Sequence, residues 1–424
     1  MAVGSGSFEA AVLLALRSRE LGLPFMEWMD RARALMPAGP AWETYLDIAA
    51  SIPVDPLSAD RDAILAVRRP PRATLDKWRD ALKAGPASDV FRAYLDVSLA
   101  CSPGLVDQRE TATAAVLDRF AGVPLLQYRA GVCGRTALLH DVLRHDAGFA
   151  DVNLELGRAA LQRERPDYDE ALKYLAAASA AFPLSATIIA TVGNIHLQRE
   201  EWPEALETFE ATLALVPTHR DALLGKVISL SHLSQHEAAV ASASLLLELG
   251  NWFVADAHYW RAWNQYRLGQ IPAARADVDR ARALARNAPT LVLSGIIAWR
   301  EGRLDAADAD FQDALNLDFG QCEAASYLGG VRAEQGRWQE GLAAFRHAAQ
   351  CFELAVVTRR KAVAELTGGA APTPAVLRQV AAHERAIAEA DARRVEAVTN
   401  IASLERRLVT PYTGDAAAPA RPSP

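Results

Sequence analysis

A small residue that returns every 34 positions constrains this chain more than any other feature of its sequence. It stands in the segments DEAL, PEAL, EAAV, DAAD and QEGL, as Ala171, Ala205, Ala239, Ala307 and Gly341, with separations of 34, 34, 68 and 34 residues. The 68-residue gap contains IPAAR, where Ala274 fits the surrounding pattern better than Ala273, one residue out of phase. A fixed period of this length indicates that one supersecondary unit is repeated along the chain.

Other residue classes keep the same phase and predict what the unit is. A glycine precedes three of the small residues by twelve positions (Gly193, Gly295, Gly329), and a bulky apolar residue follows four of them by four positions (Phe209, Val278, Phe311, Phe345). Residues four apart share a helix face, and a glycine lets a second helix approach closely. The pattern therefore predicts two antiparallel helices per unit. One such hairpin cannot bury its apolar face alone, so the units must stack into a solenoid.

This pattern resembles the tetratricopeptide repeat (TPR) family. We count six units, which span residues 150–355 and begin near Ala150, Ala186, Arg220, Val254, Ala288 and Cys322. The resemblance implies an all-α, right-handed superhelix of helical hairpins. Unit three departs from the family pattern, with Val227 in place of the glycine and Ala243 in place of the aromatic residue. The pentatricopeptide repeat, an RNA-reading relative in form, has a period of 35, and both the 34-residue spacing and the acidic balance count against it.

The flanking regions are expected to be helical without the period. Residues 1–149 are either a separate domain or degenerate units of the same superhelix, and Ser88 with Asp89 is a predicted helix N-cap. Residues 356–409 are predicted to be C-terminal capping helices. A long helix from Pro374 to about Val409 would carry an apolar stripe made of Leu377, Val380, Ile387, Val395, Val398, Ile401, Leu404 and Leu408. This helix either caps the solenoid or forms a homodimer as a coiled-coil arm. The Ala/Pro-rich residues 410–424 are predicted to be a disordered tail.

The amino-acid composition limits the classes of partner that this chain is expected to bind. Lys+Arg number 45 and Asp+Glu number 52, giving a net charge of −7, so the long-range field repels nucleic acid and anionic lipid. No apolar stretch approaches the roughly 18 residues that a membrane span requires, and the run from Ala10 to Leu16 is predicted to be a helix face instead of a signal peptide. We therefore expect neither nucleic-acid binding nor membrane insertion.

The four cysteines stand far apart with no CxxC pair, which predicts small buried thiols in a reducing compartment. The expected location is cytoplasmic, or periplasmic if the true N-terminus lies upstream.

Motifs for catalysis, metals and cofactors are missing from the sequence. There is no GxGxxG, P-loop or GxSxG segment. His140 and His145 are five residues apart, which turns them by about 140° on a helix, so they do not face one ion. The prediction is a protein that is not an enzyme, without catalytic residues, metal or cofactor. A weaker alternative is an enzyme site within residues 1–149.

The resemblance to TPR proteins implies that the first helices of the units line a concave groove that binds a partner. Carried over position by position, that groove includes Asn194, Leu197, Gln198, Ile228, His232, Ile296, Trp299 and Arg300, with Glu323 and Glu334 in unit six. In unit four, Tyr259, Trp263 and Tyr266 share one helix face and are predicted to be core. Trp260 lies about 100° away from them. Trp260 and Trp299 are either groove-facing or packed between repeats.

The predicted function is a protein–protein interaction scaffold or adaptor that binds a peptide or helix of a partner in the concave groove. The alternative is an accessory or regulatory subunit of an enzyme or envelope-assembly complex, for example one associated with a glycosyltransferase. The identity of the partner does not follow from the sequence.

Overall fold

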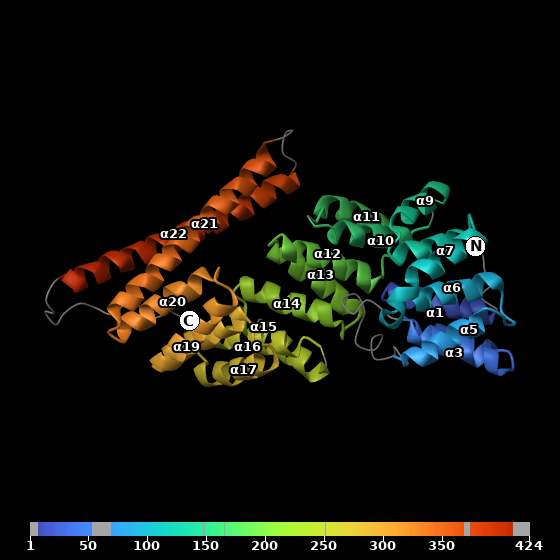
Figure 1. Cartoon of the computed structure of the whole chain (residues 1–424), viewed down its shortest axis with the longest axis horizontal. Coiled ribbons are helices and arrows are strands. Elements are labelled where there is room, and N and C mark those ends of the chain that lie inside the picture. Colours follow the sequence, from blue (N-terminus) through green and yellow to red (C-terminus); the bar gives the residue numbers. More distant parts are fainter. Residues whose placement is uncertain are drawn as a thin grey trace. The chain divides into compact units, whose positions relative to one another are not determined.

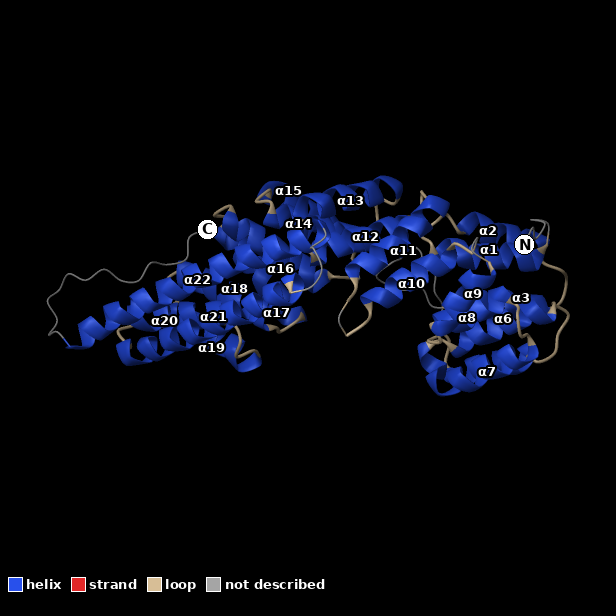
Figure 2. Cartoon of the chain, turned by 90° about the horizontal axis from the view of Figure 1, so that it is seen from above, coloured by secondary structure: helices blue, strands red, loops and turns tan. Residues whose placement is uncertain are grey.

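The computed structural model describes residues 7–52, 69–146, 149–164, 166–250, 252–368 and 374–409, and all regular structure within them is helical (Figure 2). The predicted tail at 410–424 lies outside the described residues. The chain also divides into two compact units, which are distinct from the six repeat units. The first unit is built from residues 1–196 and 204–225, and the second unit from residues 197–203 and 226–424. None of the described helices is long and apolar enough to cross a membrane.

The N-terminal region of the first unit is a bundle of short helices. Its core centres on α6, where Leu95 and Leu99 are fully buried and Phe91 meets Tyr45 edge-on, with ring centroids 5.9 Å apart. The predicted N-cap is confirmed, since the Ser88 hydroxyl accepts a hydrogen bond from the Phe91 amide at 3.3 Å. The elements are α1 (Phe8–Glu20), α2 (Met26–Leu35), α3 (Pro40–Ser51), α5 (Arg72–Leu82), α6 (Asp89–Ala100), η1 (Pro103–Gln108), α7 (Arg109–Arg119), α8 (Pro124–Val132) and α9 (Ala137–His145).

The helical hairpins follow in the predicted register (Figure 1). The first helix of every unit begins at the predicted residue or directly beside it. The pairs are α10 (Asp151–Leu161) with α11 (Tyr168–Ala181), α12 (Ala186–Gln198) with α13 (Trp202–Leu215), α14 (Arg220–His232) with α15 (His236–Leu249), α16 (Val254–Arg267) with α17 (Ile271–Leu284), α18 (Ala288–Arg300) with α19 (Leu304–Leu317), and α20 (Cys322–Glu334) with α21 (Trp338–Thr367).

Close contact between the two helices of a unit explains the repeated small residues. A methyl group added at Gly295 would lie 2.7 Å from the ring of Phe311, and one at Gly329 would lie 2.8 Å from the ring of Phe345. In the second hairpin, a methyl group added at Gly193 would lie 2.8 Å from the ring of Phe209. The fixed-period alanines are fully buried, and at the shifted position it is Ala274 that is buried while Ala273 is exposed.

Two long helices complete the second unit. α21 continues past the end of unit six to Thr367, and it packs along α22 (Pro374–Val409) as an antiparallel pair (Figure 1). The stripe predicted for α22 is only partly correct. Leu404 is buried and Val380, Ile387 and Ile401 are half-buried, whereas Leu377, Val395, Val398 and Leu408 are exposed.

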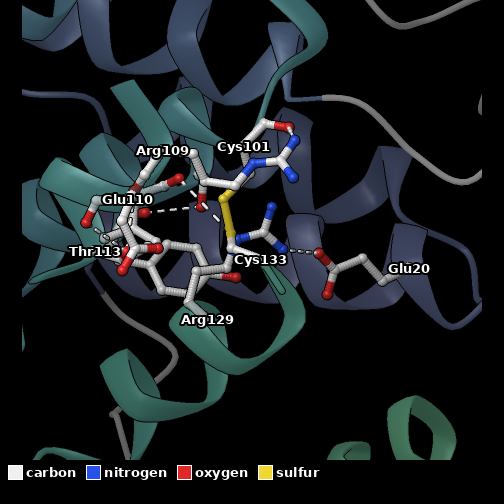
Figure 3. Close-up of a disulfide and its surroundings, with 10 residues drawn as sticks. Glu20, Cys101, Arg109, Glu110, Thr113, Arg129 and Cys133 are labelled. Carbon is white, nitrogen blue, oxygen red and sulfur yellow. Dashed lines mark hydrogen bonds and ion pairs between the residues drawn. A yellow bond between two sulfur atoms is a disulfide. The ribbon is translucent and has the colours of Figure 1, made fainter. Parts of the chain in front are cut away.

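The prediction of free, isolated thiols is wrong. Cys101 is paired with Cys133, and Cys322 with Cys351, with Cα–Cα distances of 5.6 and 5.3 Å. The first bridge joins the end of α6 to the end of α8 (Figure 3), and the second joins the start of α20 to α21 within unit six. Sequence separations of 32 and 29 residues concealed both pairs, because helical hairpins bring such distant residues together without a local motif.

Charged side chains at the end of α1 connect this helix to three others in the first unit. Arg129 of α8, only 4% exposed, donates to Glu20 at 2.7 Å beside the first disulfide (Figure 3). Arg19 donates to the carbonyl oxygens of Ala49 and Ile52 at 3.2 and 2.8 Å. Arg17 pairs with Asp151, the first residue of α10, at 2.5 Å. The helix that carries the predicted face is thus connected to α3, α8 and α10 by the residues at its C-terminal end.

The buried carboxyl group of Asp151 makes stability depend on pH. Burial raises its pKa to about 6, against the opposing effect of Arg17. A carboxyl group whose folded-state pKa is raised contributes stability below its unfolded pKa and loses it as pH rises through the folded value. Between pH 4 and 7, wild type should therefore lose up to about 3 kcal/mol of unfolding free energy relative to Asp151→Asn. Urea unfolding of both proteins at pH 4, 5.5 and 7 measures this difference, and parallel curves would contradict the assignment.

The two disulfides predict the thiol content of the oxidised chain. Because all four cysteines are paired, the denatured protein should react with no thiol reagent before reduction and at four positions after it. The variant Cys322→Ser/Cys351→Ser should lose about 2–4 kcal/mol of unfolding free energy, the usual range for a loop of this length. Detection of four reactive thiols in protein purified without reductant and refolded in air would show that the pairs do not form.

Candidate functional site

Six side chains of the second unit form a continuous surface, which we call the inner face: Trp202, His232, Tyr259, Trp260, Glu323 and Tyr327. They come from the first turn of α13, the last residue of α14, and α16 and α20. The indole of Trp202 stacks on the imidazole of His232, with ring centroids 3.9 Å apart and planes 4° from parallel. The edge of Trp260 meets His232 at 5.9 Å, and Tyr259 meets Trp260 at 5.3 Å. His232 is exposed, so this row of rings is open to solvent at its centre.

Electrostatics make the inner face neutral at its rings and acidic around them. Partial burial lowers the pKa of His232 below its usual value, even though the carboxylates of Glu200 and Glu389 act in the opposite direction. Burial, assisted by Glu323, raises the pKa of Tyr259 and of Tyr327 to about 12. All three rings are therefore uncharged at neutral pH. The carboxylates of Glu200 and Glu323 lie close to these rings, so this surface favours a ligand with apolar and basic groups.

Polar side chains beneath the inner face fix the position of the rings. Asn264 donates to the Ser231 hydroxyl and to the Trp260 carbonyl, both at 2.7 Å, and accepts from His236 at 2.9 Å. This links α14, α15 and α16 through one fully buried amide. Buried polar groups with satisfied hydrogen bonds hold one arrangement of neighbouring helices. The row of rings is therefore supported by a rigid second layer.

The structure places the nine predicted groove residues in three environments. Gln198, His232 and Arg300 are exposed, and Asn194, Leu197, Ile228 and Trp260 are half-buried. Ile296 and Trp299 are buried, at 4% and 2% exposure, and belong to the core of the second unit.

Trp299 packs between repeats and does not face a groove. Its indole nitrogen donates to Glu334 at 2.7 Å, and its ring lies directly against Gly330, where no side chain would fit. Trp260 is half-buried and contacts His232 in the row of rings. The core prediction for Tyr266 is confirmed at 2% exposure, with Tyr259 and Trp263 half-buried against the same core.

Position-by-position reasoning missed Trp202 and Tyr327. Trp202 stands three positions before Ala205, at the start of α13, where the repeat pattern assigns no binding role. Its ring stacks on the last residue of the following hairpin's first helix, a contact that no period within one unit encodes. Asn194 of the first unit donates to Asp221 at 2.5 Å and so is engaged within the chain itself.

A separate pocket of 190 Å³ lies among α5, α6 and α7 in the first unit. Its charged lining is paired internally, with Arg79 on Asp96 at 2.6 Å and Arg119 on Asp89 at 2.6 Å. No group of three or more His, Cys, Asp or Glu side chains in the described part of the chain could hold a metal ion. The pocket therefore offers no unengaged acid–base pair to build a reaction on.

Comparison with known proteins gives structural neighbours only. No protein-family model and no curated protein sequence matches the chain. Among solved structures, the chain is similar to YrrB, a TPR protein with an unusual peptide-binding site, at 20% identity and a TM-score of 0.35, covering 42% of this chain and 91% of that one. It is also similar to a thermophilic TPR protein of Thermus thermophilus, at 20% identity and a TM-score of 0.35, covering 43% and 98%.

The Cut9–Hcn1 assembly of the APC/C is similar over more of the chain, with 15% identity, a TM-score of 0.43, and coverage of 89% of this chain and 73% of that one. These overlaps are partial and low in identity. The helices of this chain are paired at a 34-residue period, and glycine–phenylalanine contacts hold the two helices of a pair close together. On this geometry, the central half of the chain is an all-α solenoid of helical hairpins with a 34-residue period.

Proposed function

We propose that this protein is an interaction scaffold whose second unit binds a helical or extended segment of a partner protein at the inner face. The single observation that carries the proposal is the row of rings Trp202, His232 and Trp260, part of which is left open to solvent on a rigid support. Exposed aromatic and arginine side chains on a rigid surface are typical binding hot spots.

The chemistry of the surface limits the partner segment. Neutral rings beside Glu200 and Glu323 favour apolar side chains flanked by lysine or arginine. The overall charge of −7 opposes nucleic acid in the same way. The partner is therefore a protein segment with a basic, amphipathic character. If that partner is an enzyme, the chain acts as its accessory or regulatory subunit, which is the alternative proposal.

We also infer that the protein works in an oxidising compartment. Two disulfides that use every cysteine of the chain are typical of secreted and periplasmic proteins and rare in the cytosol. Of the two locations considered from the sequence, this favours the periplasm.

Partner capture with paired variants tests the scaffold proposal. Wild-type protein is compared with His232→Ala/Glu323→Lys, which alters two exposed residues of the inner face, and with the control His145→Ala/Glu237→Lys, which makes the same changes at exposed positions elsewhere. Captured proteins are identified by mass spectrometry, and the affinity of the strongest is then measured with purified components.

We expect the first variant to weaken that partner at least tenfold, because hot-spot residues carry most of the binding energy, while the control binds as wild type does. Circular dichroism establishes that both variants are folded. Equal affinity of all three proteins, or no partner enriched by wild type, would refute the proposal.

A further inference from the structure

α22 runs beside the inner face of the second unit, where Glu389 lies near His232. Ala397 is fully buried in the core cluster that contains Leu328 of α20, and Ala390 packs against the same cluster. Nearer the start of α22, Arg378 pairs with Glu201 at 3.0 Å, although the two residues are 177 positions apart. α22 therefore extends from the core of unit six to the turn that precedes Trp202.

The two halves of α22 are held very differently. In the C-terminal half, Leu404 is buried at 4% exposure and packs with Leu342 and Phe345 of α21. In the N-terminal half, no residue from Val376 to Ala390 is buried. The ion pair at its beginning involves an arginine side chain that is 56% exposed, and exposed ion pairs contribute little to stability. The C-terminal half is therefore anchored in the core, whereas the N-terminal half is held by its packing along α21 and by partly exposed contacts.

Two contacts of the N-terminal half of α22 are unfavourable. The Nδ1 atom of His383 is buried, yet no hydrogen-bond partner for it stands among the described residues. Glu389 approaches Glu323 of the inner face, where burial, together with this second carboxylate, raises the pKa of Glu323 against the influence of Arg393. A buried unsatisfied nitrogen and two neighbouring carboxylates both weaken the seating of the helix.

The pattern of α22 matches the surface that it covers. Val376, Val380, Ile387 and Ala390 recur at helical spacing and give one apolar seam. Arg378 meets Glu201, and Arg393 lies near Glu323 and Tyr327. These are the apolar and basic groups that the neutral rings and surrounding carboxylates favour.

We propose that residues 374–396 form a releasable strap that occupies the inner face, and that a partner helix of the same chemistry binds by taking its place. The second half of this statement rests on the proposed scaffold function, whereas the strap itself does not. The displacing helix is amphipathic, carries small or branched apolar residues along one seam, and places arginine opposite Glu201 and Glu323. The bound partner thus competes with the chain's own helix.

The test uses the full chain and a fluorescent synthetic peptide with the sequence of residues 374–396. Arg378→Glu/Ala390→Glu loosens the strap by reversing the ion pair and placing a carboxylate against the core cluster. Arg385→Glu/Ala392→Glu is the matched control, with identical changes at exposed positions of the same helix. The peptide keeps Arg378 and Ala390 and can fill the vacated surface.

We expect the peptide to bind the loosened variant at least fivefold more tightly than wild type or the control, because an attached strap competes at high effective concentration. Hydrogen exchange should show amides 376–390 exchanging faster than amides 397–408 in wild type, and at least tenfold faster again in the loosened variant. Adding Glu201→Arg to the loosened variant should weaken the wild-type peptide, and an Arg378→Glu peptide should recover the affinity.

Failure of the peptide to bind the loosened variant, or equal binding to all three proteins, would overturn the strap. Uniform exchange along α22 would do the same. These outcomes are independent of partner capture: a strap that behaves as expected in a protein that captures no partner would refute only the scaffold proposal.

Discussion

The structure depends on the close approach of the two helices within each hairpin. Gly295 and Gly329 leave room for the rings of Phe311 and Phe345, and the alanines that return at the 34-residue period lie fully buried in the same contacts. Interiors are packed as densely as organic crystals, so one added methyl group at such a contact must displace a ring. The stacking of the hairpins and the direction of the first helices follow from that spacing.

The small residues that allow the two helices to approach recur at a fixed period, so much of the fold could be predicted from the sequence. The starts of the first helices and the shifted register at Ala274 follow from the period, whereas the long helix after Pro374 was predicted from its own apolar stripe. The N-terminal region is different, since its helices are held by unique contacts such as Arg129 with Glu20 and Arg19 with the end of α3. A contact that occurs once leaves no period to detect.

The site was predicted less completely, for a physical reason. Helical periodicity tells which side of a helix a residue occupies, but not what covers that side. Trp299 and Ile296 occupy positions that line the groove in TPR proteins, yet the neighbouring hairpin buries both. Trp202 contributes through a contact with the next hairpin, and Cys322 meets Cys351 only because the second helix of unit six returns beside the start of the first. Each of these outcomes depends on relations between helices that the repeat pattern does not specify.

A double-mutant cycle at Gly295 and Phe311 tests the central claim most directly. Alanine is intrinsically better than glycine in a helix by about 1 kcal/mol, yet Gly295→Ala should lower the unfolding free energy by about 1–3 kcal/mol, because its methyl group would press on the Phe311 ring. In a Phe311→Leu background, where the ring is gone, the same change should be much less destabilising. If Gly295→Ala stabilised the protein, or if its effect were the same in both backgrounds, close approach would not be what holds the hairpins together.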